Sequence, residues 1–174
     1  DELLVRESRR LVSRVDWDCE VKYLFSPINL GLRQRIITGL DEAFRNYDSA
    51  IILEDDCLPA KDFFPFCEAL LSRYRNTDVG LVCGFNNGSI RNISSRYFFS
   101  DFPEIWGWAT WAEIWNQYRD VEIKRDWSEL EIKSEVNSLK SRISRIRIAG
   151  LASSNLTLNT WDIEFAMHLI KKRK

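Results

Sequence analysis

Apolar residues recur at helical spacing in several parts of the chain, and this pattern predicts most of its helices. In the segment 32–47, for example, Ile36, Ile37, Leu40 and Phe44 are spaced to share one face of a helix. The remaining residues of such a segment are largely polar and face solvent. Segments with this spacing cover residues 1–12, 32–47, 61–74, 108–118 and 161–174.

Tryptophan is concentrated in one of these predicted helices. Trp108, Trp111 and Trp115 are three and four residues apart, and this spacing predicts a single helical face that packs in the core. Residues 128–148 also have a helical pattern, but they are polar and rich in basic side chains. Such a run usually forms a solvated helix face, and contact with a phosphate group or an acceptor is the less common alternative.

Shorter apolar segments predict strands. Residues 20–26 alternate apolar and polar positions, Ala50–Leu53 is a short apolar run, and Gly80–Asn87 begins with another. Residues 96–100 are a candidate for a fourth, short strand. Strands that alternate with helices are typical of a parallel sheet with right-handed crossovers. We therefore predict an α/β fold, a mostly parallel sheet flanked by helices, in one domain over residues 1–174.

Three consecutive acids, Glu54, Asp55 and Asp56, directly follow the apolar run 50–53. Open α/β sheets place their ligands at the carboxyl ends of the strands, which is where this triplet is predicted to lie. Adjacent carboxylates repel one another, and a hard divalent cation bound through oxygen would hold them together. The alternative is a polar turn in which Asp56 caps a later helix. The residues alone leave both interpretations open.

Composition narrows the class of protein. The chain has 174 residues, of which 45% are hydrophobic and 29% charged, as in an ordinary globular domain. A net charge of -1 argues against a nucleic-acid binder, which would carry a basic excess. No apolar run is long enough to span a membrane, and no signal-peptide pattern is present. The four cysteines are widely spaced and predict buried thiols in a reducing compartment, so we expect a cytoplasmic location.

The acid triplet belongs to a longer series of segments that resembles nucleotide-sugar glycosyltransferases of the GT-A fold. The resemblance is to the N-acetylglucosaminyltransferase I branch and its bacterial family-2-like relatives. The triplet alone is a weak motif, but its combination with the other segments, in the family's order over most of residues 28–168, is far more specific. The segments are NLGLRQRIITGLDEAF, AIILEDDCLPAKDFFPFCEALLSRYR, GLVCGFNN, IWGWATWAEIW and TWDIEFA.

The resemblance implies a site for a nucleotide-diphosphate sugar at the acid triplet. Asp56 would bind the catalytic Mn²⁺ or Mg²⁺ directly, Asp55 would lie near the ribose and the metal, and Glu54 would face the donor sugar. The family favours a uridine diphosphate sugar as donor. A dication that bridges both phosphates makes the nucleoside diphosphate a better leaving group.

The resemblance also implies an acceptor side. Asp162 matches the general base of the family, and Trp108 and Trp161 would line the sugar and acceptor site. A positioned carboxylate must take the proton of the acceptor hydroxyl, which is a weak nucleophile at neutral pH. One base without an enzymic nucleophile implies a single displacement on a glycan acceptor, with inversion. His168 is a candidate metal ligand, although a partly buried structural histidine is the more common case.

Two features of the family pattern are not found in the chain. Family members begin with an additional strand, and they continue beyond the W-D helix with a segment that closes over the donor. We therefore expect a GT-A, Rossmann-like domain that is truncated at both ends. There are two alternatives to an active transferase. One is an inactive fragment of the fold that acts as a binding or assembly module, and the other is a metal-dependent nucleotidyltransferase or phosphohydrolase.

Overall fold

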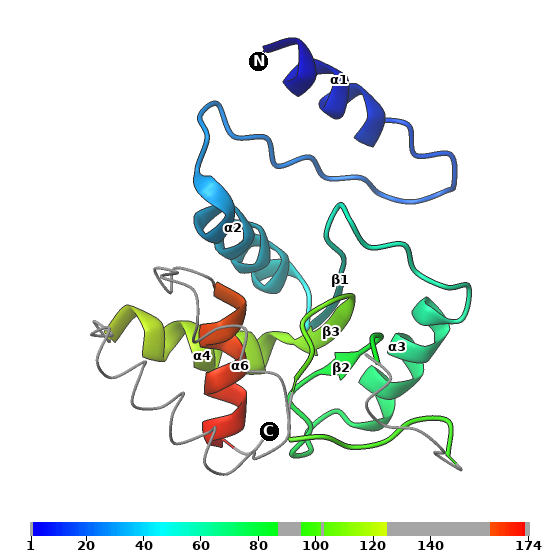
Figure 1. Ribbon diagram of the computed structural model, residues 1–174, viewed down its shortest axis with the longest axis vertical. Coiled ribbons are helices and arrows are strands. Elements are labelled where there is room, and N and C mark those ends of the chain that lie inside the picture. Colours follow the sequence, from blue (N-terminus) through cyan, green and yellow to red (C-terminus); the bar gives the residue numbers. More distant parts are fainter. Residues whose placement is uncertain (1, 87–94, 102, 125–160, 173–174) are drawn as a thin grey trace, which may run out of the picture.

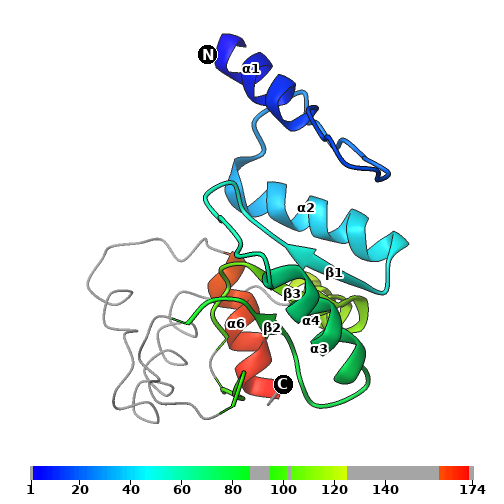
Figure 2. The same cartoon turned by 90° about the vertical axis from the view of Figure 1, so that its right-hand side faces the viewer.

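The computed structural model of the protein describes residues 2–86, 95–101, 103–124 and 161–172. Helix α3 lies on one side of a small central sheet, and α2 and α4 lie on the other (Figures 1 and 2). No helix in these ranges is both long and apolar enough to cross a membrane. The elements are α1 (Glu2–Val12), α2 (Gly31–Asn46), β1 (Ser49–Ile52), α3 (Phe63–Arg73), β2 (Val82–Cys83), β3 (Trp108–Trp111), α4 (Ala112–Lys124) and α6 (Trp161–Lys172).

The sheet has three strands in the order β1-β3-β2, and both pairings are antiparallel. Ile52 of β1 lies opposite Trp108, and Val82 of β2 lies opposite Ala109. The prediction of a mostly parallel, Rossmann-like sheet of the GT-A type is therefore wrong. β1 and β2 do run in the same direction, as alternating strands and helices predict, but they are not neighbours. A strand from later in the chain lies between them and runs the opposite way.

That central strand was predicted to be part of a helix. Residues 108–111 form β3 with all four side chains buried, and helix α4 begins only at Ala112. Successive side chains of a strand point to opposite faces, so Trp108 and Trp111, three residues apart, lie on different faces of the sheet. Their contacts agree with this geometry, because Trp108 packs on α6 and Trp111 Nε1 donates to the Leu71 carbonyl of α3 at 3.2 Å.

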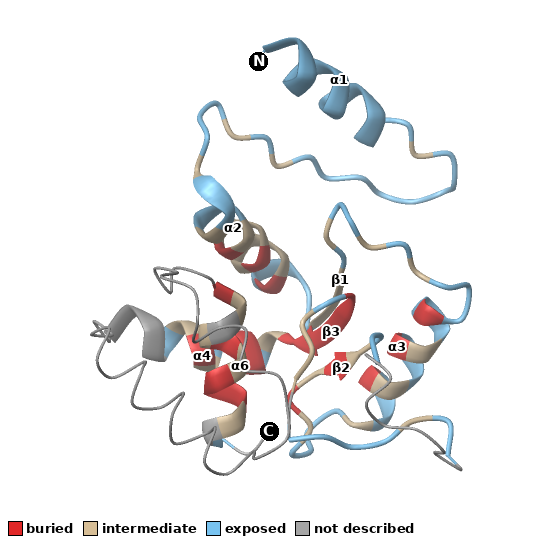
Figure 3. Ribbon diagram, viewed as in Figure 1, coloured by how far each residue is buried: buried red, intermediate tan, exposed pale blue. Residues whose placement is uncertain are grey.

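Most of the predicted helices are confirmed, with ends close to those expected. The strand predicted over residues 20–26 is not formed: this segment has no regular secondary structure, and it pairs with no strand among the described residues. Residues 96–100 also form no strand. Helix α1 has no buried residue, and it lies away from the sheet (Figures 1 and 3). The helix predicted over 128–148 lies outside the described residues.

The core is aromatic where α4 and α6 meet α2. Trp115 and Phe165 are fully buried, with ring centroids 5.5 Å apart, and both contact Trp161. Trp115 Nε1 donates to an oxygen of Asp41 on α2 at 2.7 Å, so the ring is anchored at its polar atom as well. Burial of these rings fixes the position of α6 relative to the sheet, as the red segments of Figure 3 illustrate.

Candidate functional site

The acid triplet lies in a turn that follows the end of β1. Strand β1 ends at Ile52, and the amide of Cys57 donates to the Glu54 carbonyl at 3.1 Å, which closes the turn. Asp55 and Asp56 are exposed, whereas Glu54 is partly buried. The polar-turn interpretation therefore describes the backbone correctly. Its second part does not hold, because the residue at the N-cap of α3 is Asp62 and not Asp56.

Asp162 is brought to the same end of β1 by the packing of α6. Trp161, the first residue of α6, stacks on Trp108 with ring centroids 5.8 Å apart and an interplanar angle of 28°. Trp108 in turn lies opposite Ile52, two residues before Glu54. A chain of contacts thus leads from the acid turn through the sheet to the first turn of α6. Two parts of the sequence that are far apart supply carboxylates to one place.

The pKa of Glu54 is affected by the neighbouring carboxylates. Partial burial, which disfavours the carboxylate, is the main reason that the pKa of Glu54 is raised above its ordinary value. The negative charges of Asp56, Asp162 and Asp55 raise the pKa of Glu54 further, in that order of importance. The charges of Asp55, Asp56 and Asp162 therefore all act on Glu54, and a cation near Glu54 would relieve this repulsion.

The raised pKa of Glu54 predicts how stability depends on pH. As pH rises through this pKa, the carboxylate must form near three others in the folded state but not in the unfolded state, so the free energy of unfolding falls. Glu54→Gln should therefore be more stable than the wild type at neutral pH. The gain should disappear below a pH of about 4, where Glu54 is protonated in both states. Denaturant unfolding at both pH values measures this difference in stability.

Glu68→Gln, on the exposed side of α3, is the control for Glu54→Gln. An equal gain at both pH values would contradict the assignment of charge to the turn.

Trp108 and Trp161 are buried in the core. Only 1% of Trp108 and 2% of Trp161 is exposed, and their rings cover each other. Nε1 of Trp108 is buried and has no hydrogen-bond partner among the described residues. In the structure, the two rings join α6 to the sheet and so position Asp162. Direct contact of either ring with a sugar, as the family resemblance implies, stays a prediction.

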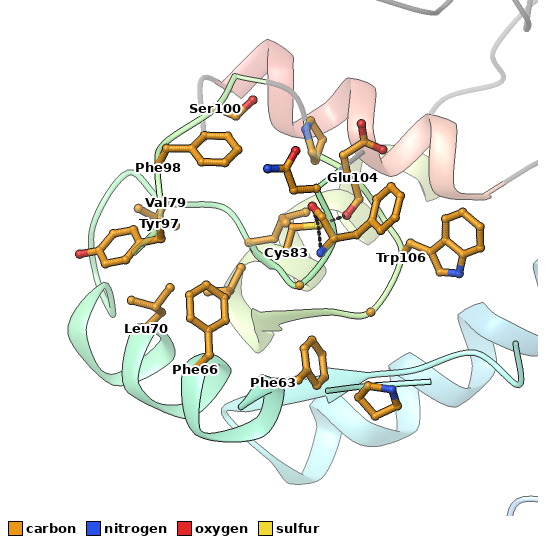
Figure 4. A pocket seen from close by; sticks show the side chains of 18 of the residues that line it. Phe63, Phe66, Leu70, Val79, Cys83, Tyr97, Phe98, Ser100, Glu104 and Trp106 are labelled. Carbon is orange, nitrogen blue, oxygen red and sulfur yellow. Dashed lines mark hydrogen bonds between the residues drawn. The ribbon is translucent and has the colours of Figure 1, made fainter. Parts of the chain in front are cut away.

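A groove of about 1140 Å³ lies beside the acid turn, between α3, β2 and residues 96–101 and 103–107 (Figure 4). Asp56 lines this groove, but Glu54, Asp55 and Asp162 do not. Asp56 is therefore the point where the acid site and the groove meet. Sequence reasoning did not identify the groove, because its walls come from segments that the sequence places far apart.

The oxygen-rich donors of the turn match Mn²⁺ or Mg²⁺ in chemical type. The described residues contain no group of three or more histidine, cysteine, aspartate or glutamate side chains placed to hold a metal ion. A dication at the exposed Asp55 and Asp56 would therefore need further oxygens from a bound ligand. His168 is 8% exposed and packs against Tyr118, with ring centroids 5.8 Å apart. These contacts favour the structural interpretation of this histidine.

Of the predicted site residues, Asp55, Asp56 and Asp162 lie near enough to Glu54 for their charges to raise its pKa, and Trp108 and Trp161 are buried in the core. The residues alone indicated only the triplet, and Asp162 was indicated by the family resemblance. No protein-family model, curated protein or solved structure matches the chain. What the protein does must therefore be inferred from its own residues.

Proposed function

We propose that the protein is an inverting, metal-dependent glycosyltransferase. It would move a sugar from a nucleotide-diphosphate donor, a uridine diphosphate sugar by preference, to a hydroxyl group of a glycan acceptor. The observation that carries the proposal is the position of Asp162, whose charge acts on Glu54 across the sheet end. A transfer of this kind needs a charged donor site and a separate base within reach of it, and these four acids can supply both.

The donor side is assigned to the acid turn. Asp56 would hold the dication, with Asp55 near the ribose and the metal, and Glu54 would face the donor sugar. The exposed carboxylates of Asp55 and Asp56 leave room for the diphosphate oxygens that must complete the coordination. When bound, the dication neutralises charge that develops on the departing diphosphate.

The acceptor side is assigned to Asp162. It lies in the first turn of α6, the end of a helix at which backbone N–H groups have no partner within the helix. In the proposed step, the acceptor oxygen bonds to the anomeric carbon as the bond from that carbon to the diphosphate breaks. The proton of the hydroxyl passes to the Asp162 carboxylate. One displacement from the opposite side inverts the configuration of the sugar.

Linked binding of metal and nucleotide tests the donor site. Mn²⁺ should bind about tenfold or more tightly when uridine diphosphate is present, because the protein carboxylates alone cannot encase the ion. Asp56→Ala should remove this coupling. Asp62→Ala, at a second exposed aspartate that lines the groove, should keep it and serves as the matched control. Calorimetric titration of Mn²⁺, with and without the nucleotide, makes the measurement for each protein.

Two results would contradict the proposal. Equal Mn²⁺ affinity with and without the nucleotide in the wild type would show that no joint site exists. If uridine diphosphate does not bind under any of these conditions, the acid turn is not a donor site. A binding or assembly module that lacks transferase activity would then be the better description of the chain.

A further inference from the structure

The groove beside the acid turn carries an exposed aromatic pair. Trp106 is 51% exposed and Phe85 is 40% exposed, and their ring centroids are 5.2 Å apart at an interplanar angle of 44°. Trp106 stands at one end of the groove, opposite the end formed by Tyr97 and Leu70 (Figure 4). Large apolar surface that stays exposed in a polar-rimmed hollow is a sign of a binding site.

The segment that carries Trp106 is hydrogen-bonded to the last residue of β2 and to the glycine that follows it. The Cys83 thiol donates to the Glu104 carbonyl at 2.7 Å, and the Gly84 amide donates to the Gly107 carbonyl at 2.8 Å. Only glycine fits at position 84, because a Cβ there would lie 2.3 Å from the ring of Phe63. These contacts hold the aromatic pair in place before any ligand arrives, which lowers the entropy lost on binding.

The charges around the groove restrict what can bind there. Among the described residues, its lining has one guanidinium, that of Arg96, against five carboxylates. Such a field repels phosphate groups, lipid headgroups with net negative charge and acidic sugars. Carboxylate oxygens instead accept hydrogen bonds from hydroxyl groups. The five acids are Asp56, Asp62, Asp78, Asp101 and Glu104.

We propose that this groove binds a neutral saccharide. The apolar C–H face of a pyranose ring would stack on Trp106 and Phe85, and its hydroxyl groups would donate to carboxylates of the rim. Exposed aromatic rings combined with hydrogen-bond acceptors match the two kinds of surface that a neutral sugar presents. Because Asp56 lines the groove, a saccharide chain held there reaches the acid turn. The role of this saccharide as the acceptor of transfer rests on the proposed function, whereas the binding of the saccharide to the groove does not.

Titration with neutral tetrasaccharides, without metal or nucleotide, tests the groove. Maltotetraose, chitotetraose and mannotetraose are the probes, and an acidic hyaluronan tetrasaccharide and phosphatidylcholine vesicles are the comparisons. At least one neutral probe should bind saturably, and Trp106→Ala should weaken it about tenfold or more. Trp17→Ala is the matched control, because Trp17 is 68% exposed and lies outside the groove. That variant should bind the probe as the wild type does.

Thermal unfolding of Trp106→Ala should match that of the wild type, since half of this side chain is already in solvent. The inference is overturned if no neutral probe binds saturably, if Trp106→Ala and the wild type bind it equally, or if only hyaluronan or the vesicles bind. The Mn²⁺ and uridine diphosphate titration of the same variant separates the two proposals. Saccharide binding that depends on Trp106, in a protein without coupled metal and nucleotide binding, would support the groove and refute the transferase.

Discussion

Asp162→Asn should lower sugar transfer by about two to four orders of magnitude, the usual effect of losing a general base. The amide has the size of the carboxylate and can still accept a hydrogen bond from the first turn of α6, but it cannot take the proton of the acceptor hydroxyl. Coupled binding of Mn²⁺ and uridine diphosphate should persist, because Asp162 is assigned to the acceptor side. Transfer to an acceptor saccharide and nucleotide titration, measured on the same preparation, give both values.

Glu164→Gln provides the matched control for this variant. Glu164 lies in the same turn of α6, but its carboxylate accepts hydrogen bonds from Arg33 at 2.5 Å and from Tyr118 at 3.2 Å. Its loss should reduce stability and should leave the transfer rate of the folded protein nearly unchanged. A near wild-type rate in Asp162→Asn would show that the base lies elsewhere. Equal losses of transfer in both variants would indicate that α6 affects transfer only by its placement in the fold, and that Asp162 is not the base.

Trp115→Ala should reduce the free energy of unfolding by about 3–5 kcal/mol, as expected for removal of a large buried ring. The side chain is 0% exposed, and its ring contacts Phe44 of α2, Phe165 of α6 and Tyr118 of its own helix, α4. Neither α2 nor α6 can move to fill the space without losing its contacts to the other helices. Urea denaturation of the variant and the wild type measures the difference.

Two further variants separate the contributions at this position. Trp115→Phe keeps most of the apolar contact but removes the hydrogen bond from Nε1 to Asp41, so it should lose less than Trp115→Ala. Asp41 also accepts from Arg119 at 3.0 Å, so its carboxylate keeps a partner. Trp17→Ala, on the exposed N-terminal segment, should change stability by no more than about 0.5 kcal/mol. A loss below about 1 kcal/mol in Trp115→Ala would contradict the proposed role of the ring in the core.

The sequence predicts elements best where one face of a helix is buried in the core and the opposite face is exposed. Ile37, Leu40 and Phe44 are all buried in α2, and their helical spacing is plain in the sequence. Strand β3 could not be recognised in this way. A spacing of three between Trp108 and Trp111 fits one face of a helix, and it also fits the two faces of a central strand. Which alternative holds depends on β1 and β2, which lie far away in the sequence.

The alternating residues 20–26 show the opposite error. Val21, Tyr23 and Phe25 have the pattern of a half-buried strand, yet all three are exposed. Alternation of apolar and polar residues indicates that a segment suits a sheet, but a strand forms only where another strand is available to pair with it. The pattern by itself carries no information about such a partner.

Only part of the candidate site could be predicted, because the rest depends on contacts between segments that are far apart in the sequence. The triplet is visible because its three acids are adjacent, whereas the nearness of Asp162 depends on how α6 packs through Trp161. Phe85 and Trp106 form a pair only because Gly84 and Gly107 bring their segments within hydrogen-bond distance. A glycine beside each aromatic residue was the available signal, and it is a weak one.

The central position of β3 also determines the order in which the chain can fold. Ser49 pairs with Trp111 and Cys83 with Trp108, so neither described pairing of the sheet can begin from a tight hairpin. The entropy of closing long loops must be overcome before any of these hydrogen bonds forms, whereas α2 and α3 can form locally. During synthesis, β1 and β2 leave the ribosome before their common partner has been made. Their strand edges stay open to other chains until residues 108–111 emerge, and nascent-chain association is the hazard that this order of synthesis creates.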